Sequence, residues 1–349
     1  METNKIYNEP CLDTLAKMND ESIDCVITSP PYWQLRDYGY EGQWGLEPTF
    51  HEYLEHLWSM MDEIYRVLKK DGTVWVNLGD TYHTHGSGSK KSSHNFKSAE
   101  LAELNGIGTI KKPLSELPEK CLLLIPHRFA IGCIDRGWIV RNDIIWAKRN
   151  GMPESVTDRF SKKHEYFFFM VKSEKYFFDL DAIRDNHKSS LKEISRQKRM
   201  DVTQGYNEAN GTKMGHSGGL GYGGKKNITG NMTENGLTRT TAGLSLKSAE
   251  EKVNEFGKNP GSVSDFWDIP TKPSSSKHYA SYNDSLLVKP VLAGCPKGGI
   301  IYDPFMGTGS TAEVAIRAGR KFIGSEMSVE YCKISDKRLN PFLIQTTMF

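Results

Sequence analysis

Apolar positions follow two different periods along the chain, and each period predicts one kind of secondary structure. Between residues 49 and 70, apolar residues recur every three to four positions and so occupy one face of a helix. Thr49 and Glu52 form a capping box at its start, and Asp71-Gly72 supplies its end. This segment is the strongest helix candidate in the sequence.

Shorter apolar runs predict buried strands before and after this helix. Several of them are rich in β-branched or aromatic residues, as strands usually are. The expected strands are 24–28, 73–78, 138–146, 165–171, 299–302 and 321–324, and further helices are expected at 126–135, up to Ala318 and at 328–339. Strands that alternate with helices predict an α/β fold with a mostly parallel, doubly wound sheet.

Two polar segments interrupt this pattern. Residues 83–112 are dominated by His, Gly, Ser and Lys, which is typical of a loop. From Asp185 to Gly261 glycine, serine and asparagine become frequent, and twelve Lys and Arg residues stand against eight Asp and Glu residues. A disordered insertion and a substrate-recognition region that orders on nucleic acid both fit this second segment.

The composition allows a nucleic-acid partner without demanding one. A chain of 349 residues with 38% hydrophobic and 25% charged residues can form one large α/β domain with a smaller appendage. Its net charge is only +2, so a local basic surface would have to bind nucleic acid. No signal peptide and no membrane-spanning run is apparent, so we expect a cytoplasmic protein without membrane contact.

Neither the cysteines nor the histidines follow a metal-binding pattern. The six cysteines include no Cys-x-x-Cys pair, so we expect reduced thiols rather than a zinc ribbon. His83 and His85 lie in a polar segment with no third ligand nearby, and we expect both to be solvated. The sequence therefore predicts no metal site.

The C-terminal part contains a strand, a glycine loop, a helix and a second strand that ends on an acid. Gly307 and Gly309 allow the backbone to approach a ligand closely, and Glu326 can accept hydrogen bonds from both hydroxyls of a ribose. The spacing is neither G-x-G-x-x-G nor that of a P-loop, which favours an adenosine ligand without a pyrophosphate. By itself, the unit also fits an ordinary strand–turn–helix connection.

A second candidate site follows the first predicted strand, at Ser29-Pro30-Pro31-Tyr32. An exocyclic amine on a base is a poor nucleophile because its lone pair is delocalised into the ring. The Ser29 hydroxyl and the Pro30 carbonyl can accept its two N–H hydrogens from a rigid strand end, and Tyr32 can stack on the base. These four residues alone also fit a simple turn, but together with the glycine loop they predict chemistry on a base.

Both segments resemble motifs of the DNA amino-methyltransferases. Residues 28–33, Thr-Ser-Pro-Pro-Tyr-Trp, look like the catalytic motif of this family. Residues 303–310, Asp-Pro-Phe-Met-Gly-Thr-Gly-Ser, look like its S-adenosylmethionine motif. The catalytic motif comes first, as in the β group of these enzymes, which carries a circular permutation of the Rossmann-like methyltransferase fold. The resemblance covers nearly the whole chain and is weakest from 185 to 262.

This resemblance implies a cofactor and the residues that hold it. S-adenosyl-L-methionine would be the methyl donor. The implied cofactor-binding residues are Asp303, Pro304, Phe305, Gly307, Thr308, Gly309, Ser310 and Glu326. Asp303 and the loop backbone would hold the methionine portion, Phe305 would pack against the cofactor, and Glu326 would hold the ribose.

The same resemblance implies the reaction. Ser29, Pro30, Pro31 and Tyr32 would act on a base flipped out of double-stranded DNA. The strand end at 77–82 is similar to a segment that lines the base pocket. In this family a serine at the first motif position is the usual mark of N4-cytosine enzymes and aspartate that of N6-adenine enzymes, although some adenine enzymes also carry serine. We therefore expect methylation of cytosine N4 and keep adenine N6 as the alternative.

Other activities fit the sequence less well. A C5-cytosine enzyme needs a thiolate, typically in Pro-Cys order, whereas Cys295-Pro296 has the reverse order. Methyltransferases that act on RNA or on protein glutamine often carry Asn-Pro-Pro-Tyr after the glycine loop. A catalytically inactive DNA-binding module would be expected to lose Ser29, Gly307 or Gly309, and all three are present.

The resemblance also implies an organisation and partners. Residues 1–184 would form the catalytic part of the methyltransferase domain, 185–262 a partly flexible target-recognition insertion, and 263–349 the S-adenosylmethionine-binding part. Double-stranded DNA is the expected partner, in a bacterial, archaeal or phage setting. A cognate restriction endonuclease and a homodimer are both compatible with the resemblance, and no residue decides either question.

Overall fold

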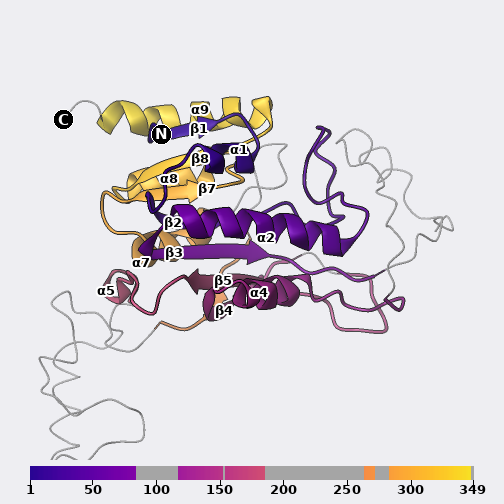
Figure 1. The fold of residues 1–349 in the computed structure, drawn as a ribbon. Helices are drawn as coiled ribbons and strands as arrows, with labels where there is room; N and C mark the ends of the chain where they lie inside the picture. Colours follow the sequence, from indigo (N-terminus) through magenta and orange to yellow (C-terminus); the bar gives the residue numbers. More distant parts are fainter. Residues whose placement is uncertain (84–116, 152–153, 185–262, 272–282, 347–349) are drawn as a thin grey trace, which may run out of the picture. The chain divides into compact units, whose positions relative to one another are not determined.

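The structure of the protein is a computed structural model. It describes residues 1–83, 117–151, 154–184, 263–271 and 283–346 (Figure 1). The elements described below belong to one compact unit, formed by Met1–Ala182 and Ser264–Phe349. The polar segment at 83–112 lies almost entirely outside the described residues, and so does the one at 185–261. The proposed division of the chain at this second segment therefore stays a prediction.

The described residues form an eight-stranded sheet that is mostly parallel, as the alternation of strands and helices predicted. Across the sheet the order is β1 (Lys5–Tyr7), β8 (Lys321–Ser325), β7 (Ile300–Asp303), β2 (Ile23–Thr28), β3 (Leu68–Leu78), β5 (His164–Val171), β4 (Ile139–Ala147) and β6 (Phe266–Asp268). The pairings of β5 with β3 and with β4 are antiparallel, and the others are parallel. Because β2 pairs with β7, the loops that follow these two strands leave the same edge of the sheet.

Helices cover both faces of this sheet (Figure 1). One face carries α1 (Cys11–Ala16), α2 (Phe50–Val67) and α4 (Ile125–Asp135), and the other carries α7 (Asp284–Gly294), α8 (Ser310–Arg317) and α9 (Val329–Thr346). A short helix, α5 (Leu180–Ile183), follows β5. The unit is thus a three-layer, doubly wound α/β structure of the Rossmann-like kind.

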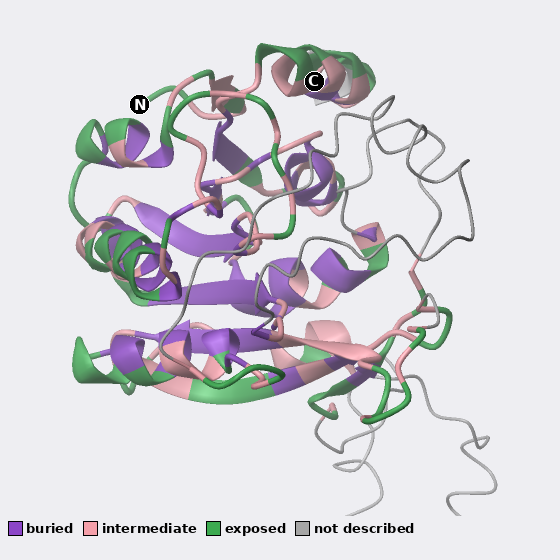
Figure 2. Ribbon diagram, turned by 90° about the vertical axis from the view of Figure 1, so that its right-hand side faces the viewer, coloured by how far each residue is buried: buried purple, intermediate pink, exposed green. Residues whose placement is uncertain are grey.

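The core is divided by the sheet into two layers. Val26 and Val74 enter the layer beneath α2, while their neighbours Ile27 and Trp75 enter the layer beneath α7 and α8. All four side chains are buried, and Figure 2 shows buried strands between helices whose outer faces are exposed. Burial on both faces explains why these strands are continuous apolar runs rather than alternating ones.

The strongest predicted helix, α2, is confirmed together with its cap. The Thr49 hydroxyl accepts the N–H of Glu52 at 3.2 Å, which is one of the two hydrogen bonds of the predicted capping box. Its apolar positions share one buried face, formed by Phe50, Tyr53, Leu54, Leu57, Met60, Met61, Ile64 and Val67. This face packs the helix over β2 and β3, and its Tyr53 side chain reaches the turn that follows β2.

The ends of two helices differ from the prediction. α2 ends at Val67, and β3 begins at once at Leu68, so Asp71-Gly72 lies inside the strand instead of ending the helix. Leu68 is extended and pairs with Ile23 of β2, so burial in the sheet overrides the helical pattern there. α9 extends beyond the predicted end to Thr346.

His83 also differs from the prediction, because it is buried with 2% exposure rather than solvated. Its backbone N–H donates to the Cys121 carbonyl at 2.7 Å, which ties the segment to the one before α4. His85 lies outside the described residues. Within the described ranges, no three His, Cys, Asp or Glu side chains gather as metal ligands would, and no helix has the length and apolarity of a membrane span.

Candidate active site

The catalytic turn, residues 29–32, leaves the carboxyl end of β2 at the centre of the sheet. Pro30 and Pro31 lack backbone N–H donors, so the strand cannot continue through them. The Tyr53 hydroxyl of α2 donates to the Pro31 carbonyl at 2.8 Å, and the indole N–H of Trp33 donates to the Glu47 carbonyl at 3.0 Å. Proline rigidity and these two neutral hydrogen bonds therefore hold the backbone of the turn.

The glycine loop, residues 303–310, leaves the carboxyl end of the neighbouring strand β7. Gly307 and Gly309 have φ values of +56° and +82°, which L side chains rarely adopt. A Cβ atom on Gly309 would also lie 3.2 Å from the Ser335 side chain of α9. Ser335 in turn donates its hydroxyl to the Gly307 carbonyl at 2.8 Å. Glycine is thus required where the loop turns into α8.

The Asp303 side chain stabilises this loop through hydrogen bonds. One carboxylate oxygen accepts the Phe305 N–H at 3.0 Å, and the other accepts the Thr311 hydroxyl at 2.6 Å. The side chain is 1% exposed, and this burial raises the pKa of Asp303 to about 6, although both hydrogen bonds favour the charged form. The carboxylate thus faces the loop itself, and the cofactor contact expected for it stays a prediction.

Glu326, directly after β8, closes the loop from the other side. Its carboxylate accepts the Gly307 N–H at 2.9 Å and the Ser328 N–H at 2.7 Å. Burial raises the pKa of Glu326, while these two hydrogen bonds act in the opposite direction. A carboxylate with further lone pairs is therefore held at the point where the glycine loop meets β8.

One cavity of about 330 Å³ brings the catalytic turn and the glycine loop together. Of the residues that the sequence predicted, it is lined by Ser29, Pro30, Pro31, Tyr32, Phe305, Gly307, Thr308, Ser310 and Glu326. Pro304 lines a smaller neighbouring cavity, and Asp303 and Gly309 line neither. Two motifs from opposite ends of the chain thus line one cavity, as expected if both act on the same reaction.

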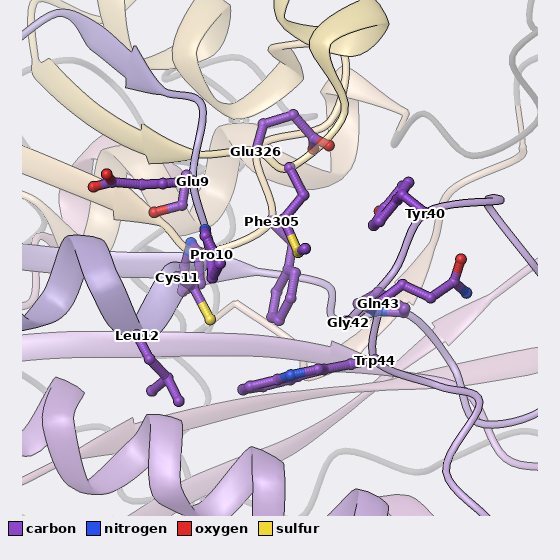
Figure 3. Close-up of a pocket in the computed structure, with 14 residues that line it drawn as sticks. Glu9, Pro10, Cys11, Leu12, Tyr40, Gly42, Gln43, Trp44, Phe305 and Glu326 are labelled. Atoms are coloured by element: carbon purple, nitrogen blue, oxygen red, sulfur yellow. The ribbon is translucent and has the colours of Figure 1, made fainter.

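The smaller cavity, of about 70 Å³, continues from Phe305 and Glu326, which line both cavities. Figure 3 shows the Phe305 ring between Glu326 and the ring of Trp44, and the centroids of the Phe305 and Trp44 rings are 5.4 Å apart. Pro10 lies on the same wall, and no Lys or Arg is among the described residues that line it. This arrangement suits a flat, uncharged ring system next to a diol that Glu326 can bind.

Several lining residues were not singled out from the sequence. Glu165 comes from β5, Lys148 from the segment directly after β4, and Tyr331 from α9. They belong to no short motif, so only the pairing of strands and the packing of loops reveals them. The strand end at Asn77 does line the large cavity, as the resemblance implied.

Cys295 cannot supply the nucleophile that C5 methylation of cytosine needs. It is fully buried at the end of α7 and lines neither cavity. Burial raises the pKa of its thiol to about 12, so the thiolate is scarce at neutral pH. Its position is that of a structural cysteine.

Comparison with other proteins identifies the family. Residues 23–337 match the family model of DNA methylases of the N6/N4 class. The type II methyltransferase M.SmaI of Serratia marcescens is 31% identical over 336 residues, which are 96% of this chain and 90% of that protein. M.Cfr9I of Citrobacter freundii, another type II methyltransferase, is 30% identical over 334 residues, 96% of this chain and 87% of that protein.

Solved structures show the same fold at lower identity. The PvuII DNA methyltransferase, described as cytosine-N4-specific, has a TM-score of 0.57 at 16% identity and covers 97% of this chain and 86% of its own. A protein of Thermus thermophilus, solved in complex with S-adenosyl-L-methionine, has a TM-score of 0.52 at 17% identity, with coverages of 97% and 93%. The chain therefore belongs to the DNA methylase family, among the amino-methyltransferases of the β group.

Proposed function

We propose that the protein transfers a methyl group from S-adenosylmethionine to the N4 amino group of cytosine in double-stranded DNA. The observation that carries the proposal is the shared cavity, in which Ser29 and Pro30 line the same space as Gly307, Thr308 and Glu326. Transfer between a base and a cofactor requires their two binding sites to meet, and a cavity lined by both segments supports this.

The catalytic turn supplies the acceptors. The Ser29 hydroxyl and the Pro30 carbonyl accept the two N–H hydrogens of the amine, which draws its lone pair out of conjugation with the ring. Because the proline ring and the Tyr53 hydrogen bond fix the turn beforehand, little reorganisation is needed during reaction. Tyr32 stacks on the flipped base and keeps its amine at the acceptors.

The residues that line the two cavities suit S-adenosylmethionine in their chemistry. Its adenine would lie by Phe305 and Trp44, its ribose hydroxyls would donate to Glu326, and its methionine end would lie along Gly307 and Thr308. When bound, it supplies a methyl group activated by a positively charged sulfur. The aromatic walls of the smaller cavity favour this cofactor over one with phosphates, and so does a glycine loop that is not followed by the lysine of a P-loop.

Cytosine N4 is preferred over adenine N6 because serine, rather than aspartate, stands at position 29. A neutral hydroxyl can accept one N–H and turn its own hydrogen elsewhere, which suffices for either amine. The choice therefore rests on the resemblance at this position. The PvuII enzyme, which shares this fold, is described as cytosine-N4-specific, so the fold accommodates that reaction.

Expression in a host without DNA methylation, followed by single-molecule mapping of modified bases, tests the proposal. We expect N4-methylcytosine in a short sequence motif, and its loss in the Ser29→Ala and Gly307→Asp variants. N6-methyladenine in such a motif would overturn the choice of base and keep the mechanism. Unmodified DNA from a folded protein that binds S-adenosylmethionine would reject the reaction as proposed.

A further inference from the structure

The hydroxyl of Tyr32 is engaged by two side chains from other strands. It lies 2.7 Å from a Glu165 carboxylate oxygen of β5 and 3.0 Å from the Asn77 side-chain oxygen of β3. Both partners line the large cavity with Tyr32. The tyrosine proposed to stack on the base is therefore fixed at both ends, by the catalytic turn and by this pair of acceptors.

Each acceptor is itself held in place. The Asn77 amide donates to the Tyr166 carbonyl at 3.0 Å, which turns its oxygen towards Tyr32. Lys148 of the neighbouring segment forms an ion pair with the other oxygen of Glu165, and its ammonium also lies 4.3 Å from the Trp146 ring centroid. The side chains of Glu165 and Lys148 are only 14% and 21% exposed, so solvent competes little with the contact.

The edge of the Tyr32 ring is fixed as well. A Cβ atom on Gly79 would lie 2.5 Å from Cε2 and 2.9 Å from Cδ2 of the ring. Gly79 follows β3, so the backbone of that strand end lies directly against the tyrosine. The ring is thus bounded by backbone along one edge and by two acceptors at its tip.

We propose that Glu165, with Asn77 and Lys148, is a positioning residue that fixes the Tyr32 ring as a preformed platform for the flipped base. The proposal rests on the proposed function, in which a base stacks on Tyr32. Asn77 and Glu165 act through the phenol hydroxyl, Lys148 acts through Glu165, and Gly79 leaves the space that the ring needs.

The physical advantage is that the ring is ordered before the base arrives. An unrestrained tyrosine would have to lose side-chain freedom on binding, and small errors in the base position would move the amine away from Ser29 and Pro30. Loss of the contact at the phenol should slow methyl transfer about tenfold, the effect of one modest interaction in the transition state. Cofactor binding should change little, because these residues act on the Tyr32 ring and are not among those proposed to hold the cofactor.

A double-mutant cycle between Tyr32→Phe and Glu165→Ala tests this inference. The measured quantity is the rate of tritiated methyl transfer from S-adenosylmethionine to unmethylated genomic DNA, with cofactor affinity and melting temperature as controls. We expect each single variant to be about tenfold slower and the double variant to match Tyr32→Phe. Glu165→Gln keeps an acceptor for the phenol and should recover most of the rate.

The other outcomes separate the inference from the proposed function. If Glu165→Ala slows methyl transfer by the same factor in the wild type and in Tyr32→Phe, the positioning role is wrong. It is also wrong if neither single variant changes the rate. If Glu165→Gln is as slow as Glu165→Ala, the carboxylate acts by its charge or by taking a proton, and the inference is wrong. In each case the wild-type rate and its loss in Ser29→Ala leave the proposed function standing, whereas no wild-type transfer removes both.

Discussion

The catalytic turn and the glycine loop leave neighbouring parallel strands at the same edge of the sheet, yet they are held by different chemistry. The turn is fixed by two prolines, by a neutral hydrogen bond from Tyr53, and by the contacts of the Tyr32 hydroxyl with Asn77 and with the Glu165 carboxylate. The loop is fixed by two buried carboxylates, Asp303 and Glu326, that accept backbone and hydroxyl hydrogens. We therefore expect changes in the turn to act mainly on the rate, and changes in the loop to act on cofactor affinity and on the pH dependence of stability.

The largest expected effect lies in the turn. Ser29→Ala removes one of the two acceptors proposed for the amine, and loss of such a preorganised contact costs about a hundredfold or more in rate. Cofactor affinity should stay close to its wild-type value, because the proposed partner of the Ser29 hydroxyl is the amine of the base and not the cofactor. Single-turnover transfer and titration calorimetry with S-adenosylmethionine measure the two quantities. The Ser22→Ala variant, before β2, is the matched control. A large loss of S-adenosylmethionine affinity in Ser29→Ala would contradict the separate roles of the turn and the loop.

Asp303 should make folding stability depend on pH. Burial raises its pKa to about 6 in the folded chain, so folding favours the protonated acid. The protonated acid therefore stabilises the folded chain fully below the unfolded pKa of about 4. This stabilisation, about 3 kcal/mol of the free energy of unfolding, is lost as the pH rises through 6. Asp303→Asn cannot titrate, so the stability of the wild type relative to this variant should fall between pH 4 and 7. Urea unfolding at several pH values measures this, and a constant difference would contradict it.

Glu326 provides the corresponding test of cofactor affinity. In Glu326→Gln the amide can accept only on one side, so either the Gly307 or the Ser328 N–H loses its acceptor. A buried donor left without its partner costs about 1–3 kcal/mol, and we expect the dissociation constant of S-adenosylmethionine to rise at least about tenfold. The rate at saturating cofactor should change less. Glu330→Gln, at the exposed start of α9, is the matched control, and equal affinities for the two variants would argue against a role of Glu326 in binding.

The same contrast explains what the sequence could predict. Ser29, Gly307 and Glu326 lie in short segments whose roles were predicted from the two segments taken together and from their resemblance to a known family, and the structure places them around one cavity. The doubly wound sheet followed from strands that alternate with helices, a local pattern repeated along the chain. Both predictions needed only information carried within a few neighbouring residues or in their order.

The missed features depend on contacts between distant segments. Glu165 reaches Tyr32 only because β5 runs antiparallel between β3 and β4, a reversal that no local period reveals. Leu68 continues the apolar face of α2 in sequence, yet it pairs with Ile23 in the sheet. His83 lies in a polar segment but is buried by its link to Cys121. In all three, tertiary contacts override local propensity.

The smallest expected effect concerns the support of the turn from α2. Tyr53→Phe removes the hydroxyl that donates to the Pro31 carbonyl at 2.8 Å and leaves the buried ring in place. One such neutral hydrogen bond contributes about 1 kcal/mol, so we expect a slightly lower free energy of unfolding and a rate reduced by a few fold. Tyr65→Phe, on the same helix but 36% exposed, is the control. If Tyr53→Phe instead lowered cofactor affinity and left the rate unchanged, a change confined to the turn would have altered the glycine loop. The turn and the loop would then be coupled and would not act separately on rate and affinity.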